Sequence, residues 1–325
     1  EVGAAEAVEG AGVTIRRGEI LAPDGTQLTE TPLDRLGLEA PLVSLHRAEL
    51  HRALASCVPD RRIETGRRAV DVAEGDGSVE LQFEAGESAA GELVVVADGL
   101  DSGLRSRLFP DYEVEYAGRI SWLTTVPFED GNWSRHESHE IQGRGRRFGW
   151  SFIDDETVGW YANYNAAEDF RPDGDLREDL RERFAGWPEP VGELIELSES
   201  TEIIRTPIYF GETLEQWGRG RVGLLGDAAH PMTPDLAQGA CQAIEDAAVL
   251  VDELAEAVSP AALRRYADRR RPRAEEVSER SEMLGRISNW QSRIACWVRK
   301  KMFQWTPERV GHEQFRELVS YDFLA

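Results

Sequence analysis

Lysine is almost absent from this sequence of 325 residues, which contains only Lys300 and Lys301. Its 60 acidic residues outnumber 37 basic ones and give a formal charge of −23. Such a surface repels nucleic acid, which argues against a nucleic-acid partner. The excess is also typical of halophilic proteins, in which concentrated salt screens self-repulsion. An ordinary acidic enzyme from a GC-rich genome, which favours arginine codons, explains the composition equally well.

Long apolar runs and paired cysteines are missing as well. No stretch of eighteen apolar residues is present, so no transmembrane segment is expected, and the first residues lack the basic and apolar regions of a signal peptide. Cys57, Cys241 and Cys296 lie far apart and form no CxxC pair, so neither a disulfide framework nor a metal site is indicated. We expect a soluble, cytoplasmic protein.

Hydrophobic patterns predict an α/β chain that is interrupted by a β-rich segment. Residues 114–165 are rich in Trp, Tyr, Thr and Val, which is typical of an antiparallel sheet. The flanking parts alternate strands with helices. The expected strands there are Val13–Ile15, Ile20–Ala22, Ala69–Val72, Val79–Phe83, Leu93–Ala97, Ser200–Tyr209 and Arg221–Leu225, and the expected helices are Leu45–Val58, Asp175–Phe184, Cys241–Val258 and Ala261–Arg286.

The strongest motif is RVGLLGDAAHPMTPDLAQGACQAIEDAAVL, residues Arg221–Leu250. A buried strand delivers Asp227 at its carboxyl end, where ligands of open α/β sheets bind. Asp227 is suited to accept a hydrogen bond from a ribose hydroxyl. Gln238 and Gly239 open a helix whose free N–H groups favour an anion, including the pyrimidine edge of a reduced flavin. The plainer alternative is a strand–loop–helix turn that Asp227 merely caps.

This stretch closely resembles the GD motif of the class A flavoprotein monooxygenases, the group that includes p-hydroxybenzoate hydroxylase, salicylate hydroxylase, FAD-dependent urate hydroxylase and zeaxanthin epoxidase. Two further blocks agree with the family. Ala97–Arg105 (ADGLDSGLR) resembles its ADGxxSxxR segment, and Tyr266–Arg273 (YADRRRPR) resembles its arginine-rich stretch. The resemblance covers essentially the whole chain and is weakest in the middle sheet.

The resemblance implies a Rossmann-like FAD-binding domain (residues 1–112 and 208–286), interrupted by a β-rich substrate domain (113–207) and followed by a C-terminal helical segment (287–325). It implies an FAD-dependent monooxygenase in which NADH or NADPH reduces the flavin. A C4a-hydroperoxide then hydroxylates or epoxidises a small aromatic or unsaturated substrate. Another flavin oxidoreductase of this fold, such as a reductase or dehydrogenase, and a truncated non-catalytic remnant are the alternatives. The oligomeric state is open, and a homodimer is one option.

Carried over residue by residue, the family assigns several positions to FAD. Asp227 contacts the ribose and pyrophosphate region, Arg47 faces the flavin, and Asp98 lies near both the flavin and the nicotinamide. Backbone groups of Ala69 or Val70 meet the adenine. The isoalloxazine is lined by Pro234, Leu236, Ala237, Gln238, Gly239 and Ala240.

Other positions are assigned less directly. The substrate lies between the flavin and the middle sheet, and His230 is expected to be a loop residue near the flavin rather than a catalytic base. No catalytic acid or base is assigned. The candidate substrate residues are Trp122, Trp150, Trp160, Tyr161 and Arg205, and aromatic side chains in a sheet are more often core.

The chain departs from the family in two ways. Ala237 replaces the first glycine of the usual Gly-Gln-Gly, and its Cβ restricts the backbone. The opening GxGxxG unit is also missing, because Gly10–Gly12 and Gly143–Gly145 do not match its spacing. We therefore expect a truncated N-terminus that could weaken FAD binding.

Two further segments invite a functional interpretation. His136 and His139 have HxxH spacing, and we expect a solvated turn rather than a metal site there. The segment Ile287–Trp305, aromatic and basic, is expected to pack against the FAD domain, with a membrane surface as the less favoured alternative.

Overall fold

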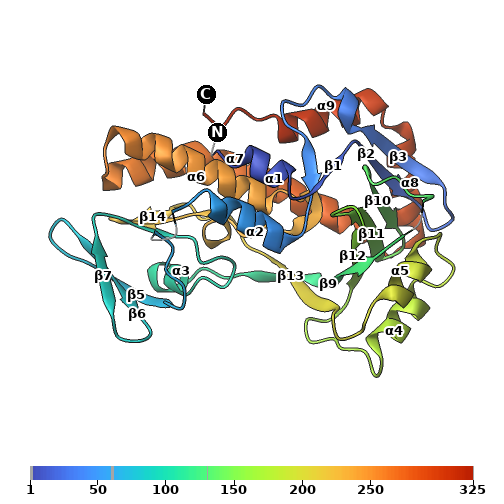
Figure 1. Ribbon diagram of the computed structural model, residues 1–325, viewed down its shortest axis with the longest axis horizontal. Coiled ribbons are helices and arrows are strands. Elements are labelled where there is room, and N and C mark those ends of the chain that lie inside the picture. Colours follow the sequence, from blue (N-terminus) through green and yellow to red (C-terminus); the bar gives the residue numbers. More distant parts are fainter. Residues whose placement is uncertain (1–2, 60–61, 130, 325) are drawn as a thin grey trace. The chain divides into compact units, whose positions relative to one another are not determined.

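The computed structural model describes residues 3–59, 62–129 and 131–324, so Glu1, where the sequence begins, lies outside the described residues. These residues form two units. Figure 1 labels their helices and strands. The sheet unit comprises Glu1–Val58, Gly118–Ile208 and Arg286–Tyr321, and the motif unit comprises Pro59–Ala117, Tyr209–Gly285 and Asp322–Ala325. Residues 3–58 thus group with the middle sheet. The assignment of FAD and substrate to particular domains stays a prediction.

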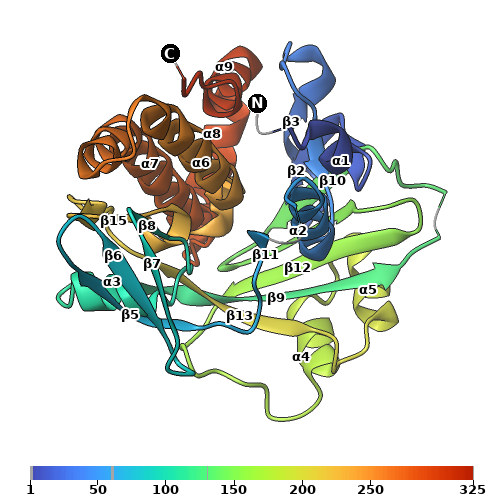
Figure 2. The same cartoon turned by 60° about the vertical axis from the view of Figure 1, so that its left-hand side comes forward.

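A seven-stranded mixed sheet organises the sheet unit (Figure 2). Its strand order is β13-β9-β12-β11-β10-β2-β3. The pairs from β9 through β10 are antiparallel, as is β2 with β3, whereas β10 pairs with β2 in parallel. The strands are β2 (Arg17–Leu21), β3 (Gln27–Pro32), β9 (Glu115–Pro127), β10 (Glu137–Gln142), β11 (Arg146–Phe152), β12 (Thr157–Asn165) and β13 (Ile204–Phe210).

One face of this sheet is apolar and packs against helices α4 (Leu176–Arg183) and α5 (Val191–Leu197). Phe148 stacks on Trp160 with ring centroids 5.1 Å apart and contacts Phe184 edge-on. The indole N–H of Trp160 donates to Ser198 Oγ at 3.0 Å. Because side chains alternate along a strand, the opposite face carries a separate set, which includes Glu140, Arg147 and Tyr161.

The remaining elements of the sheet unit surround this sheet. Helix α8 packs on β3, and α9 does the same. These elements are α1 (Ala5–Glu9), the two-stranded sheet of β1 (Val13–Ile15) and β4 (Leu42–Ser44), the 3₁₀ turn η1 (Leu33–Arg35), α2 (Arg47–Ser56), α8 (Arg293–Trp305) and α9 (Glu308–Val319).

The motif unit contains two small sheets and long helices. Its sheets have the orders β14-β15-β8 and β5-β6-β7, and β15 pairs with β8 in parallel. The elements are β5 (Ala69–Glu74), β6 (Val79–Phe83), β7 (Ser88–Gly91), β8 (Val94–Val96), α3 (Gly103–Leu108), β14 (Gly218–Arg219), β15 (Val222–Leu224), the 3₁₀ turns η3 (Gly226–Ala228) and η4 (Pro234–Leu236), α6 (Gly239–Glu256) and α7 (Pro260–Ser288).

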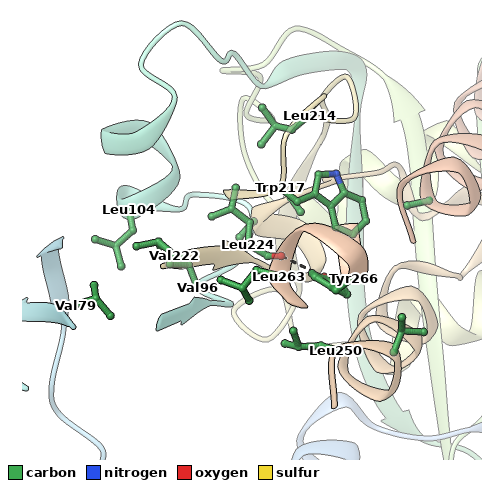
Figure 3. Close-up of a cluster of buried hydrophobic side chains, with 14 residues drawn as sticks. Val79, Val96, Leu104, Leu214, Trp217, Val222, Leu224, Leu250, Leu263 and Tyr266 are labelled. Atoms are coloured by element: carbon green, nitrogen blue, oxygen red, sulfur yellow. Dashed lines mark hydrogen bonds between the residues drawn. The ribbon is translucent and has the colours of Figure 1, made fainter. Parts of the chain in front are cut away.

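Strands β8 and β15 pack against α6 and α7 through one hydrophobic core (Figure 3). Leu224 is wholly buried there, and Trp217 and Tyr266 meet edge-on with centroids 5.6 Å apart. The Tyr266 hydroxyl donates to the Leu224 carbonyl at 3.2 Å. The core therefore holds the end of β15 against α7.

The mixed α/β fold class is confirmed, and most expected elements exist with shifted ends. The helix expected from Leu45 begins at Arg47, because His46 caps it: its Nδ1 accepts the Ala48 N–H at 3.1 Å. The expected strand from Ser200 begins only at Ile204. Gly10–Gly12 and Gly143–Gly145 lie outside helices and strands.

The solvated-turn prediction for His139 is wrong. His139 is buried in β10, stacks on Trp150 with centroids 4.9 Å apart, and hydrogen-bonds Glu19. Burial lowers the pKa of its imidazole, and the hydrogen bond to Glu19 opposes that shift. Within the described ranges, no cluster of three or more His, Cys, Asp and Glu residues could hold a metal ion.

Gly149 is needed where the Tyr161 ring crosses β11. A Cβ at Gly149 would lie 2.5 Å from the ring carbons of Tyr161. We predict that Gly149→Ala lowers the free energy of unfolding by about 1–3 kcal/mol through overpacking. In a Tyr161→Ala background the same substitution should cost well under about 1 kcal/mol. Urea denaturation measures both, and Gly192→Ala, where helix α5 has open space, is the control. Equal costs in the two backgrounds would contradict the explanation.

Candidate flavin-binding site

Two acidic residues follow neighbouring parallel strands in the motif unit. Val96 of β8 pairs with Leu224 of β15, and the Leu225 N–H donates to the Val96 carbonyl at 2.9 Å. Asp98 and Asp227 therefore leave the sheet at the same carboxyl edge. Both residues are exposed, although Val96, two residues before Asp98, and Ala228, directly after Asp227, are buried. This is the edge at which open α/β sheets bind ligands.

Arg105 ties the two loops of this edge together. Its guanidinium is buried and donates to the carbonyl oxygens of Asp227 at 3.1 Å and Leu100 at 2.6 Å. Ser102 starts α3 by accepting the Arg105 N–H on its Oγ at 2.9 Å. The serine and arginine of ADGLDSGLR thus act on the backbone, because they set the positions of the loops that carry Asp98 and Asp227.

A buried ionic network lies behind the Asp227 loop. Asp246 of α6 is wholly buried; its Oδ2 accepts the Gly226 N–H at 3.0 Å and hydrogen-bonds His230 Nε2 at 2.6 Å. Its Oδ1 accepts from Arg270 Nε at 2.8 Å. Arg270, on α7, also pairs with Glu245 at 2.6 Å. The network joins both ends of η3 to the two long helices.

The network accounts for the buried position of the His230 side chain. The imidazole has no exposed surface and contacts Trp217 at a centroid distance of 4.8 Å. A side chain held inward by Asp246 cannot reach a bound ligand. We therefore assign His230 a structural role in the loop.

The second half of the loop is held by Ser281 of α7. Its Oγ donates to the Thr233 carbonyl at 2.6 Å and accepts the Leu236 N–H at 3.3 Å. The next residue, Ala237, adopts the left-handed conformation, φ 53° and ψ 33°, and is the non-glycine with positive φ among the described residues. The chain then enters α6 at Gly239. Ala237 therefore occupies a backbone conformation that glycine adopts without strain.

The helix start is suited to an anion or a flavin ring. Helix α6 spans 18 residues, and Gln238 at its N-cap makes no side-chain capping hydrogen bond. A Cβ built on Gly239 would lie 3.8 Å from Asp227 Oδ1, so the carboxylate and the helix start are neighbours. A hydroxyl-binding carboxylate beside uncapped N–H groups fits the ribose and ring portions of FAD. These residues are compatible with the cofactor that the motif predicts.

The other predicted cofactor residues are placed separately. Ala69 and Val70 are half-buried at the start of β5, in the motif unit. Arg47 is exposed at the first position of α2, in the sheet unit. The structure therefore brings together Asp98, Asp227 and the residues from Pro234 to Ala240, while the roles of Arg47, Ala69 and Val70 stay predictions.

Three of the candidate substrate residues are core residues of the sheet unit. Trp122, Trp150 and Trp160 are buried, and the indole N–H of Trp122 donates to the Tyr164 hydroxyl at 2.7 Å. Arg205 donates to the Phe170 carbonyl at 3.1 Å and so fastens a loop. The packing alternative for the tryptophans is thereby favoured.

A polar cluster on the other face of the sheet escaped the sequence reasoning. Glu140 accepts hydrogen bonds from the Tyr161 hydroxyl, from Gln142 Nε2 at 2.6 Å and from Arg147 Nη1 at 3.4 Å. Tyr161 reaches Glu140 across Gly149, which requires three strands in register. The signal in the sequence was limited to Glu140 and Gln142, two polar residues at alternate positions of β10, which is unusual for a buried sheet face. Arg147 and Tyr161 join them only through the register of β11 and β12.

The fold and the loop around Asp227 define a flavin-binding α/β protein, and comparisons with known proteins give the family. Residues 59–281 match the family described as FAD binding domain. The chain belongs to this family, within the group of FAD-dependent aromatic monooxygenases.

Individual relatives agree. Aurachin C monooxygenase/isomerase of Stigmatella aurantiaca is 37% identical over 306 residues, covering 93% of this chain and 80% of that protein. 2-Heptyl-3-hydroxy-4(1H)-quinolone synthase of Pseudomonas aeruginosa is 29% identical, covering 89% and 76%. The structure of Klebsiella pneumoniae HpxO complexed with FAD and uric acid is similar with a TM-score of 0.90 at 27% identity, covering 97% of this chain and 82% of that one.

The left-handed backbone of Ala237 should lower the stability of the fold, and this effect can be measured. We predict that Ala237→Gly raises the free energy of unfolding by about 1 kcal/mol, because relief of the left-handed strain outweighs the extra entropy of the unfolded chain. Ala247→Gly, in the middle of α6, should lower it by about 1 kcal/mol. Chemical denaturation compares the two; a loss of stability in both variants would show that Ala237 is unstrained.

Asp246 should make stability depend on pH. Burial alone would raise the pKa of Asp246, but the hydrogen bond from His230 and the charge of Arg270 lower it below its ordinary value. The ionised group therefore stabilises the fold above the unfolded-state pKa of about 4, and this contribution is lost as pH falls through the folded-state pKa.

We predict that Asp246→Asn costs about 3 kcal/mol at neutral pH, because it leaves Arg270 only partly paired, and that the difference from the unmodified protein shrinks as the solution is acidified. Asp252→Asn, on the same helix as Asp246, breaks an exposed pair with Arg269 of α7 and should cost under about 1 kcal/mol at any pH. Denaturation curves across the acid range give both values. A difference that stays constant with pH would refute the ionic role.

Proposed function

We propose that this FAD-dependent monooxygenase hydroxylates an aromatic ring that carries both a nitrogen and an oxygen substituent, of the 4-quinolone kind. The relatives' names support this class: they include synthesis of 2-heptyl-3-hydroxy-4(1H)-quinolone, 2-monooxygenation of 3-amino-4-hydroxybenzoate and 3-monooxygenation of 6-hydroxynicotinate. Oxygen and nitrogen substituents make a ring electron-rich. Such rings suit a flavin that, once bound and reduced, activates dioxygen for transfer of one atom.

The observation that carries the proposal is the loop from Gly226 to Gly239, which is fixed from behind by Asp246, Arg105 and Ser281. In this role Asp227 accepts hydrogen bonds from the ribose region of FAD. The uncapped start of α6 stabilises negative charge at the flavin's pyrimidine edge. A preorganised site of this kind needs no reorganisation when charge develops. NADH or NADPH serves as the electron donor in this proposal.

The polar cluster on the sheet offers the complementary groups for such a ring. Glu140 can accept a hydrogen bond from a ring N–H, and Arg147 can donate to a ring oxygen. Tyr161 and Gln142 hold the Glu140 carboxylate in place. Glu140, Arg147 and Tyr161 therefore orient the substrate in this proposal, and Trp122 and Trp160 pack the core of the sheet unit. A substrate contact of Arg205, which fastens a loop, stays a prediction.

The cellular setting belongs to the same proposal. Among the described helices none is long and apolar enough to cross a bilayer. We propose a cytoplasmic enzyme, since the chain has three free cysteines and no disulfide in the described part. Adaptation to concentrated salt, which the charge of −23 favours, and assembly as a homodimer stay predictions.

Replacement of Asp227 tests the cofactor site. Asp227→Ala should weaken FAD binding about ten- to hundredfold, since hydrogen bonds to a charged group contribute about 1.5–3 kcal/mol. Glu256→Ala, at the other end of α6, should leave it unchanged. FAD binding is followed by flavin fluorescence. Unchanged affinity in Asp227→Ala would remove this residue from the site.

The reaction is tested with the FAD-loaded protein, NADH or NADPH, and a 2-alkyl-4(1H)-quinolone under isotopically labelled dioxygen. We expect a product that has gained one labelled oxygen atom, and Glu140→Gln should raise KM for the quinolone more than it lowers kcat. Flavin reduction without incorporation of labelled oxygen would instead identify another kind of flavin oxidoreductase.

A further inference from the structure

Helix α8 of the sheet unit exposes apolar side chains and buries a charged one, whereas an ordinary surface helix does the reverse. Its apolar side chains face outward: the exposed fractions are 76% for Ile294, 57% for Trp297 and 72% for Trp305. Val298 and Met302 lie on the same face and are exposed as well. These positions recur at intervals of three and four residues, so they form one stripe along the helix.

The inward side of α8 holds a charge instead. Arg299 is only 4% exposed, and its guanidinium donates to the carbonyl oxygens of Ile287 at 3.1 Å and Gly143 at 2.7 Å. These hydrogen bonds fix the rotation of α8 about its own axis. They also give partners to carbonyl groups at the end of α7 and in the β10–β11 turn. Helix α8 contacts β3, but this contact leaves the apolar stripe exposed.

The charge of the helix contrasts with that of the chain. Sixty of 325 residues are acidic, yet none lies between Glu282 and Glu308. Both lysines of the protein, Lys300 and Lys301, are in α8. The Lys301 ammonium lies 5.9 Å from the Trp305 ring, at the edge of the apolar stripe. A basic helix with exposed tryptophans is the composition that binds in the headgroup region of an anionic bilayer.

We propose that the outward face of α8, formed by Ile294, Trp297, Val298, Met302 and Trp305 and flanked by Lys300 and Lys301, docks the protein on an anionic lipid surface. The apolar side chains enter the interface while Lys301 contacts lipid phosphates, and Lys300 does so in exchange for its partly exposed ion pair with Asp24. A second copy of this chain fits less well, because a symmetric pairing of α8 with α8 would bring the lysines of the two copies close to each other. This inference does not depend on the identity of the substrate.

Co-sedimentation of the full chain with vesicles tests the proposal. We expect binding to phosphatidylcholine vesicles that contain phosphatidylglycerol, weakening with added salt, and at least about tenfold weaker binding to phosphatidylcholine alone. Lys300→Gln with Lys301→Gln should reduce binding to the anionic vesicles roughly tenfold or more, given about 1 kcal/mol for each charge. Ile294→Ser with Trp305→Ser should reduce binding by at least a similar factor.

The matched control is Val258→Ser with Met283→Ser, which removes two exposed apolar side chains outside α8 and should not change vesicle binding. Sedimentation velocity is measured on the same variants without lipid. Equal binding of all variants, or no binding to anionic vesicles, overturns the proposal. So does a dimer of the unmodified chain that Ile294→Ser with Trp305→Ser dissociates, because the stripe would then be a protein interface.

Discussion

The carboxylate of Asp246 is the contact on which the candidate flavin site depends most. An ionised group without exposed surface is costly to desolvate, and the cost is offset here because each oxygen has partners. One oxygen meets the Gly226 N–H and His230, and the other meets Arg270. Through these bonds the strand end, the loop and both long helices share a single buried charge centre, which specifies one arrangement of the loop.

The residues that hold the loop differ from the residue that is proposed to contact the cofactor. Asp246, Arg105 and Ser281 hold the loop from its inner side, mostly through backbone groups, while Asp227 stays exposed on the outer side. A site whose supporting shell is rigid keeps its ligand groups in place without the ligand. The strained backbone of Ala237 lies two residues before α6 begins, and such strain persists only where the surrounding structure fixes the conformation.

Local patterns predicted the motif unit well because its signals are short-range. The strand before Asp227 and the helix after Gly239 follow from apolar runs and helical spacing, and the replacement of glycine at Ala237 was visible directly. The Asp246–Arg270 pair was not predictable in this way, since it joins positions 24 apart on two different helices. The arginine-rich stretch was noticed only through its resemblance to a family, and the structure supplies its physical reason.

The sheet unit was harder to interpret because both faces of its strands carry large side chains. Composition identified the strands, but only the register shows that Trp122 and Trp160 share the buried face while Tyr161 points the other way. His139 was misjudged for the same reason: its polar neighbours in sequence lie on alternate faces, and its real neighbours are Trp150 and Glu19. Register depends on pairings between distant segments, which a single sequence does not display.

Net charge and local charge lead to opposite expectations for the outward face of α8. A protein of charge −23 is repelled by an anionic surface at long range. At physiological ionic strength, however, interactions between exposed charges are largely screened beyond about 8 Å. At contact, therefore, only the charges close to the lipid act. In α8 these are basic, and Asp24, which pairs with Lys300 at 3.5 Å, is the acidic group that offsets part of them. In the proposed docking, the lysines and the exposed tryptophans of α8 therefore supply the attraction, although the net charge of the chain is negative.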